Sequence, residues 1–177
     1  MEKSNKLKKK ILFFVGTRPE LIKLYPLIKV FKKEKKRFDI KVCFTNQHKE
    51  LINSSLKLFK LKPDFKLDIM KKNQSIEYVT ENLLNKITKL FKNKFFPDLV
   101  FVQGDTNTAF GASLISFYNK IKIAHIEAGL RTHKKYEPFP EETLRQMISK
   151  LADYHFTPTK FSKRNLLPKG KIIILAL

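Results

Sequence analysis

The segment ILFFVGTRPELIKLYPLIKVF, residues 11–31, decides the fold class of this chain. It opens with a continuous apolar run over residues 11–15, which is typical of a strand buried on both faces of a parallel sheet. Gly16 ends this run, and apolar residues then recur at helical spacing over residues 21–31. A buried strand that leads directly into a helix predicts the first unit of an α/β fold.

The same alternation of strands and amphipathic helices continues along the chain. Further strands are predicted at 40–45, 65–70, 99–102, 121–126, 154–157 and 172–175. Further helices are predicted at 51–59, at 76–90, from after Thr106 to about 118, at 140–152 and at 159–167. We therefore expect a doubly wound, mostly parallel, Rossmann-like sheet over residues 11–177, with a basic extension over residues 1–10.

Length and charge narrow the class of protein. The 177 residues fit one domain that can bury a core. The net charge of +21 fits a nucleic-acid-binding protein, because basic surfaces attract phosphate backbones. However, the lysines are spread along the whole chain and no nucleic-acid-binding module occurs. We expect no specific nucleic-acid partner and a weak preference for anionic ligands.

The chain shows no sign of membrane insertion or of disulfide bonds. No apolar run approaches the roughly 20 residues that a membrane-spanning helix needs, and the run at residues 11–15 is too short for a signal peptide. The single cysteine, Cys43, excludes an internal disulfide and fits a reducing cytoplasm. Its apolar neighbours indicate a small buried hydrophobe. We expect a cytoplasmic protein that does not associate with membranes.

Three polar clusters follow predicted strands, where sheets of this type bind their ligands. The first is GTRPE, residues 16–20. A helix N-terminus offers free N–H groups to an anion, Arg18 could hold a phosphate, and Lys23 would add a charge. Alternatively, Thr17 and Glu20 form a capping box with a purely structural role.

The second cluster is QGDTNT, residues 103–108. A carboxylate that follows an apolar strand points into the crevice above the sheet, where desolvation could raise the pKa of Asp105. The structural alternative is that Asp105 caps the next helix, a position that Asp, Thr and Asn all favour.

The third cluster spans the segment that follows the strand at 121–126. Glu127 is expensive to bury there without a function or a partner, and Arg131 could be that partner in a structural ion pair. Glu141 and Glu142 lie in the first turn of a helix, where the dipole favours acids whatever their function. Arg145, one turn later, could pair with Glu141 or bind substrate.

Several other kinds of site lack support. The four histidines, His48, His125, His133 and His155, do not show a metal-ligand spacing, so no metal is expected. The glycine-rich dinucleotide and phosphate-loop motifs are absent, and so is a serine nucleophile elbow.

Taken in order, the clusters resemble the non-hydrolysing UDP-N-acetylglucosamine 2-epimerases over residues 11–167. The resemblance rests on FVGTRPE at 14–20, TNQH at 45–48, QGDTNT at 103–108, EAGLRT at 127–132, PEE at 140–142 with Arg145, and YHFTPT at 154–159. The arginine, proline and glutamate of the first motif favour the non-hydrolysing branch over the hydrolysing one.

This resemblance implies a function and a set of residues. It implies a two-domain, glycosyltransferase-B-like fold, and reversible conversion of UDP-GlcNAc to UDP-ManNAc by elimination and re-addition of UDP, without an added cofactor. It also implies a homodimer of the complete enzyme. Carried over by motif, the acid/base residues are Asp105, Glu127 and Glu141. The residues around the substrate are Arg18, Lys23, Gln47, His48, Arg131 and Arg145.

Length sets this chain apart from the family it resembles, whose members are about twice as long. We expect the chain to comprise the N-terminal domain, to lack the C-terminal nucleotide-binding domain, and to show no appreciable epimerase activity alone. It would then be an incomplete epimerase, a half-enzyme subunit that needs a separate C-terminal partner, or a sugar-nucleotide-binding module without catalysis. A glycosyltransferase of the same fold is a further alternative.

Overall fold

A parallel sheet forms the centre of the molecule. The computed structural model describes residues 7–45, 56, 58–69, 74–166 and 173–176. Within that part, seven strands pair in the order β3-β2-β1-β4-β5-β6-β7, and every pair is parallel. The strands are β1 (Lys9–Val15), β2 (Phe38–Phe44), β3 (Phe65–Lys66), β4 (Leu99–Gln103), β5 (Lys122–Ile126), β6 (Tyr154–Thr157) and β7 (Ile173–Ala176).

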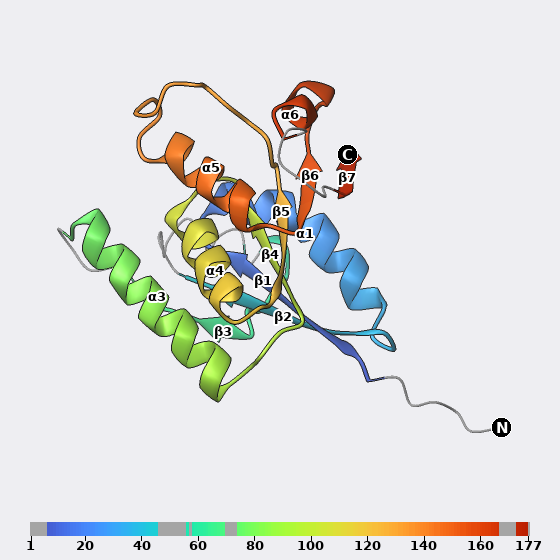
Figure 1. Ribbon diagram of the computed structural model, residues 1–177. Helices are drawn as coiled ribbons and strands as arrows, with labels where there is room; N and C mark the ends of the chain where they lie inside the picture. Colours follow the sequence, from blue (N-terminus) through green and yellow to red (C-terminus); the bar gives the residue numbers. More distant parts are fainter. Residues whose placement is uncertain (1–6, 46–55, 57, 70–73, 167–172, 177) are drawn as a thin grey trace.

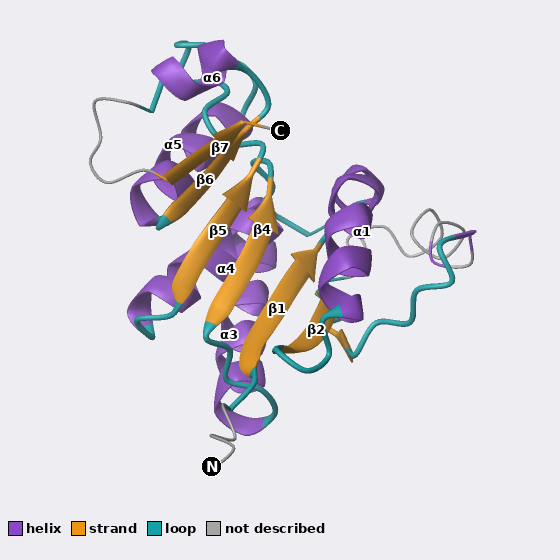
Figure 2. Ribbon diagram, turned by 90° about the vertical axis from the view of Figure 1, so that its right-hand side faces the viewer, coloured by secondary structure: helices purple, strands orange, loops and turns teal. Residues whose placement is uncertain are grey.

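The order of the strands reverses between β1 and β4. The chain moves outward in one direction from β1 to β2 and β3, and in the other from β4 to β7 (Figure 2). The crevice outside the carboxyl ends of two such strands is where open α/β sheets bind ligands. By this rule, the expected ligand-binding position lies after Val15 and Gln103.

Helices cover both faces of the sheet. They are α1 (Arg18–Lys33), α3 (Ile76–Asn93), α4 (Asn107–Tyr118), α5 (Glu141–Leu151) and α6 (Lys160–Arg164). Helix α1 lies on one face, and α3, α4 and α5 lie on the other (Figure 1). Right-handed crossovers require this arrangement, because the connections from β1 and from β4 run in opposite directions along the sheet.

Strand β1 contributes to a hydrophobic core on each side of the sheet. Leu12 and Phe14 pack toward α3 and α4, and Ile11, Phe13 and Val15 pack toward α1. All five side chains are buried, which confirms the sequence-based prediction of a strand covered on both faces. Their burial is the main reason that this segment forms a central strand.

Cys43 lies in the core that α3 and α4 cover, and it is a free cysteine. Burial raises the pKa of its thiol, so the thiolate that would act as a nucleophile is disfavoured. The prediction of a small buried hydrophobe is confirmed.

The same hydrogen-bonding pattern recurs at the amino ends of three strands. An aspartate immediately before a strand accepts a hydrogen bond from a main-chain N–H of the neighbouring strand, and a lysine beside that N–H pairs with the same aspartate. The hydrogen-bonded pairs are Asp64 with Val42, Asp98 with Lys10 and Asp153 with Ile123, at 2.9, 2.8 and 2.9 Å. Each bond satisfies an N–H that the parallel ladder leaves unpaired.

We expect replacement of Asp153 by alanine to lower the free energy of unfolding by about 1–3 kcal/mol, because the half-buried N–H of Ile123 loses its acceptor. Urea denaturation of the purified chain measures this loss. Asp39→Ala is the matched control: this aspartate lies within β2 and has no side-chain hydrogen bond among the described residues. An equal loss in both variants would contradict the proposed role of Asp153.

Several predicted boundaries are wrong. Strand β2 covers Phe38–Phe44 and not residues 40–45. Strand β1 begins at Lys9, because Lys9 and Lys10 pair with Phe38 and Asp39 of β2, so the basic extension does not reach residue 10. Strand β3 covers only two residues of the predicted 65–70. Most of the predicted helix 51–59 lies outside the described residues. None of the helices in the described part of the chain is long and apolar enough to cross a membrane.

Candidate active site at the carboxyl ends of the strands

The turns after β4 and β5 lie side by side. The N–H of Gly104 donates to the carbonyl oxygen of Ile126 at 3.0 Å, which joins the two turns directly. Gly104 has a φ of +69°, a left-handed conformation that glycine adopts without strain. A side chain of that residue would approach the Glu127 carboxylate. The two candidate carboxylates, Asp105 and Glu127, therefore come from adjacent turns.

Three donated hydrogen bonds hold the Glu127 carboxylate. The Lys23 ammonium lies 2.6 Å from each carboxylate oxygen, and the side-chain amide of Gln103 donates to Oε2. The alternative of a Glu127–Arg131 ion pair is wrong, because the Arg131 guanidinium donates to the Leu130 carbonyl and, at 2.9 Å, to the Ser149 hydroxyl of α5.

Asp105 forms an ion pair and does not cap a helix. Its Oδ2 accepts from the Arg145 guanidinium at 2.5 Å, and its side chain is 25% exposed. The cap of α4 is Thr106, whose hydroxyl accepts from the N–H of Ala109 at 3.1 Å. The capping alternative for Asp105 is therefore wrong. Its carboxylate is oriented by a cation and remains partly open to solvent.

Arg145 connects α5 to the turn after β4. Besides Asp105 it contacts the fully buried carboxylate of Glu142, at 3.3 Å, and it does not pair with Glu141. Glu142 also accepts from the N–H of Thr132 at 3.0 Å and from the Gln146 amide. Burial favours the neutral acid, but these donors and the guanidinium outweigh it and lower the pKa of Glu142. Glu142 is thus a structural anchor that the sequence did not single out.

Glu141 begins α5, one residue after Pro140 and not at it as predicted. The residue is partly exposed, while its Oε2 is buried without a hydrogen-bond partner among the described residues. Since buried carboxylate oxygens are rarely left unpaired, this oxygen is suited to accept a hydrogen bond from a ligand or from water.

The remaining candidates are residues that were predicted to bind the substrate. Arg18 is exposed at the first turn of α1 and has no hydrogen-bond or ion-pair partner among the residues that the structure describes. Gln47 and His48 lie outside the described residues. The Lys23 ammonium, predicted to bind substrate, forms an ion pair with Glu127.

His125 supports the Gly104 turn from within the sheet. Its Nε2 lies 2.7 Å from the Gly104 carbonyl oxygen, and burial lowers the pKa of the imidazole to about 3. The ring is therefore neutral at physiological pH and Nε2 carries the proton, because a carbonyl oxygen can only accept. The turn that carries Asp105 thus has a rigid support.

Glu20 is a buried carboxylate at the same end of the sheet, with 2% of its surface exposed. The predicted capping box with Thr17 is present. Burial raises the pKa of Glu20 to about 7; hydrogen bonds from Thr106, Gly16 and Thr17 oppose this shift, and the Asp105 charge adds to it. Part of the Glu20 population is thus neutral near pH 7.

We expect Glu20→Gln to change the pH dependence of stability. A pKa raised from 4.5 to about 7 by folding means that the fold is favoured below 4.5 and that this contribution is lost as pH rises through 7. Between about pH 5 and pH 8 the unfolding free energy of the wild type should fall by roughly 2–3 kcal/mol relative to Glu20→Gln. Urea denaturation at both pH values measures the difference.

Glu142→Gln is the control for this prediction. Because folding lowers the pKa of Glu142, the stability that its carboxylate contributes is present above the unfolded pKa and is lost only as pH falls through the folded value. Its difference from the wild type should therefore stay nearly constant between about pH 5 and pH 8. A constant difference for Glu20→Gln as well would contradict the prediction.

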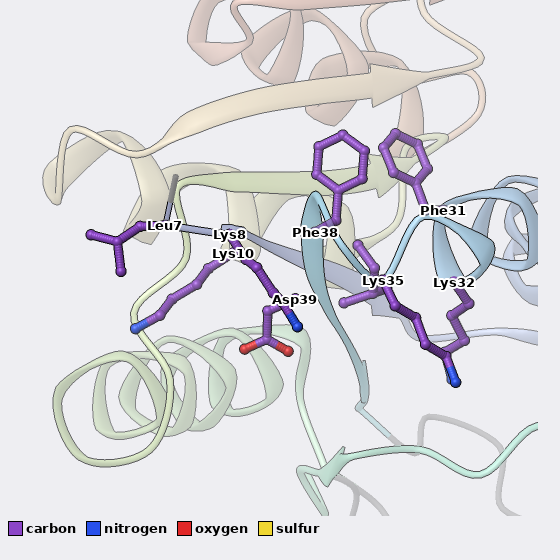
Figure 3. A pocket seen from close by; sticks show the side chains of 9 residues that line it. Leu7, Lys8, Lys10, Phe31, Lys32, Lys35, Phe38 and Asp39 are labelled. Carbon is purple, nitrogen blue, oxygen red and sulfur yellow. The ribbon is translucent and has the colours of Figure 1, made fainter. Parts of the chain in front are cut away.

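A surface cavity lies at the opposite end of the sheet. It has a volume of about 770 Å³, with an apolar floor of Phe31, Phe38 and Ile40 and a rim that includes Lys10 and Lys35 (Figure 3). None of the residues that line this cavity belongs to the candidate site. Within the described part of the chain, no group of His, Cys, Asp or Glu side chains is arranged to hold a metal ion.

Comparison with known proteins gives one consistent family. The family model described as UDP-N-acetylglucosamine 2-epimerase matches residues 31–172. The UDP-N-acetylglucosamine 2-epimerase of Neisseria meningitidis serogroup A is 47% identical over 169 residues, which are 93% of this chain and 45% of the relative. A crystal structure of the Neisseria meningitidis enzyme bound to UDP-GlcNAc has a TM-score of 0.87 at 47% identity, over 93% of this chain and 45% of that one.

A more distant structure agrees on the fold. MurG from Acinetobacter baumannii, which has the glycosyltransferase-B fold, has a TM-score of 0.62 at 12% identity over 94% of this chain and 45% of MurG. The predicted Rossmann-like half of a glycosyltransferase-B-like fold is confirmed. This chain spans about half the length of the curated relatives it matches.

Proposed function

The chain belongs to the UDP-N-acetylglucosamine 2-epimerase family, and from that membership we propose that it supplies the acid/base half of an enzyme that interconverts UDP-GlcNAc and UDP-ManNAc. The observation that carries this proposal is the convergence of Asp105 and Glu127 in adjacent turns, each oriented by a cation. A relative whose crystal structure contains UDP-GlcNAc shares the fold and 47% of the aligned residues.

This arrangement suits elimination and re-addition of UDP. The proton on C2 of the sugar has no adjacent carbonyl to acidify it, so departure of UDP from C1 must lead. The sugar then develops positive charge, which nearby carboxylates stabilise, and one carboxylate removes the C2 proton. Re-addition of UDP after protonation on the opposite face gives the epimer. Both directions need carboxylates in fixed positions.

The roles follow from motif and geometry together. Asp105, Glu127 and Glu141 share the roles of base, acid and charge stabiliser among them, with no one role assigned to any of the three. Arg18, exposed at the N-terminus of α1, binds the diphosphate through its guanidinium. Lys23 orients Glu127 and comes near the sugar.

The other residues keep supporting roles in this proposal. Arg145 orients Asp105, Arg131 braces the segment between β5 and α5 through Ser149, and Gln47 and His48 contact the substrate. We further propose that the complete enzyme is cytoplasmic and forms a homodimer. Light scattering of the complete enzyme tests whether it is a dimer.

A chimera tests the function directly. This chain is joined to the part of the Neisseria meningitidis relative that it does not match and is supplied with UDP-GlcNAc in D₂O. We expect UDP-ManNAc to form with one deuterium at C2, because the proton that returns comes from solvent. A folded chimera that forms no UDP-ManNAc and incorporates no deuterium at C2 would contradict the proposal.

The same assay separates the alternatives. This chain alone should form no UDP-ManNAc. If the chain acts as a half-enzyme, adding the relative's C-terminal part as a separate polypeptide should restore turnover. A binding module would retain UDP-GlcNAc in equilibrium dialysis and leave it unchanged in both the mixture and the chimera. A glycosyltransferase would require an acceptor.

A further inference from the structure

Glu20 joins the two loops that bound the crevice. Its Oε2 accepts hydrogen bonds from the N–H groups of Gly16 and Thr17, the latter at 2.8 Å. Its Oε1 accepts from the hydroxyl of Thr106 at 2.5 Å. Gly16 and Thr17 follow β1, whereas Thr106 follows β4 and lies 86 residues further along the chain. One carboxylate thus connects both sides of the point where the strand order reverses.

A capping role does not account for this geometry. A capping box needs a glutamate that reaches back to its own N-cap, and Oε2 alone satisfies that need. The second oxygen is directed to another helix. There the Thr106 hydroxyl donates to Glu20 while it accepts from the N–H of Ala109, so its rotamer and its proton are both fixed. The ionised form of Glu20 thus lies at the N-termini of both α1 and α4, where the helix dipoles favour a negative charge.

We infer that Glu20 is a positioning residue that acts through Thr106 to fix the Asp105 turn. Asp105 is then held in two ways. Arg145 binds its carboxylate, and Glu20 holds the backbone through the adjacent residue, Thr106. For its catalytic consequence this inference rests on the proposed function. A misplacement of about 1 Å in a catalytic group can lower turnover about 100-fold, which is why a fixed turn matters.

The test uses variants that break this link and leave most of the site in place. Thr106→Val keeps the shape of the side chain and removes the hydroxyl, and Glu20→Asp keeps the charge but is too short to reach both loops. Thr106→Ser restores the hydroxyl. Thr17→Ala is the matched control, since it removes the other half of the capping box and leaves the Glu20–Thr106 bond intact.

The first measurement is the ¹³Cγ resonance of Asp105 in the labelled 177-residue chain. We expect Thr106→Val and Glu20→Asp to displace this resonance, Thr106→Ser to return it to the wild-type position, and Thr17→Ala to leave it there. Circular dichroism confirms that each variant is folded. This readout does not depend on catalysis, so it remains decisive if the chimera proves inactive and the proposed function fails.

The second measurement is turnover of UDP-GlcNAc by the chimera. Thr106→Val and Glu20→Asp should lower kcat about 10- to 100-fold, with KM changed less than about threefold, because the link positions Asp105 and does not bind substrate. If both variants lose thermal stability as Thr17→Ala does, but keep the Asp105 resonance and kcat, the inference is overturned and Glu20 is only a cap.

Discussion

Replacing Asp105 by asparagine in the chimera is expected to lower kcat for UDP-GlcNAc epimerisation by about 10²- to 10⁴-fold, the usual contribution of a positioned acid or base. Asparagine keeps the size of the side chain and an oxygen that can accept from Arg145. It cannot exchange a proton or stabilise positive charge on the sugar. The measurement is initial-rate UDP-ManNAc formation, with deuterium incorporation at C2 followed in parallel.

Asp98→Asn is the matched control for this substitution. Asp98 precedes the strand that Asp105 follows, so the two aspartates lie at opposite ends of β4, and both accept hydrogen bonds from the protein. We expect Asp98→Asn to lower stability and to leave kcat near the wild-type value. Equal kcat values for the two variants would mean that Asp105 only anchors Arg145.

The strands could be predicted because burial leaves a direct record in the sequence. Residues 11–15 form a continuous apolar run since both faces of β1 are covered, and the run at 99–102 has the same cause. The ends of elements were less predictable. Lys9 and Lys10 belong to β1 because of main-chain pairing with β2, and such pairing does not depend on whether a side chain is apolar.

The candidate site could be predicted in location but not in its contacts. Strand ends followed by glycine and acidic residues indicated the crevice, and the structure brings Asp105 and Glu127 together there. The choice of cation for each carboxylate was not predictable. Glu127 pairs with Lys23, which is distant in sequence, and not with nearby Arg131, whose guanidinium donates to Ser149 of α5.

Glu142 and Gln103 illustrate a second limit. A glutamate in the first turn of a helix is common on surfaces, so no local pattern indicates that Glu142 is fully buried and accepts a hydrogen bond from Thr132. Gln103 ends an apolar strand, where its amide could be recognised as a partner for a neighbouring carboxylate only after the strand order was known. Long-range partners require the topology, and local patterns do not contain it.

The largest expected effect on folding is that of Gly129→Ala, and Gly104→Ala is its matched control. Both glycines follow a strand in the left-handed region, at φ +87° and +69°, so alanine at either position should cost about 1–2 kcal/mol in backbone strain. The two surroundings differ. A Cβ on Gly129 would lie 2.2 Å from the main-chain oxygen of Ser162 in α6, whereas a Cβ on Gly104 would meet nothing closer than 3.9 Å.

The obstacle at Gly129 is backbone and cannot rotate away. Relief requires α6 to move off the turn after β5, which would also break the 2.9 Å hydrogen bond from Asn165 to the Gly129 carbonyl. Forced repacking of this kind adds about 1–3 kcal/mol, so we expect Gly129→Ala to lose about 2–5 kcal/mol in urea denaturation and Gly104→Ala about 1–2 kcal/mol. Equal losses would show that backbone conformation alone requires glycine in these turns. A larger loss at Gly129 would show that close packing of α6 against the EAGLRT turn selects it, and that this packing holds the turn carrying Glu127.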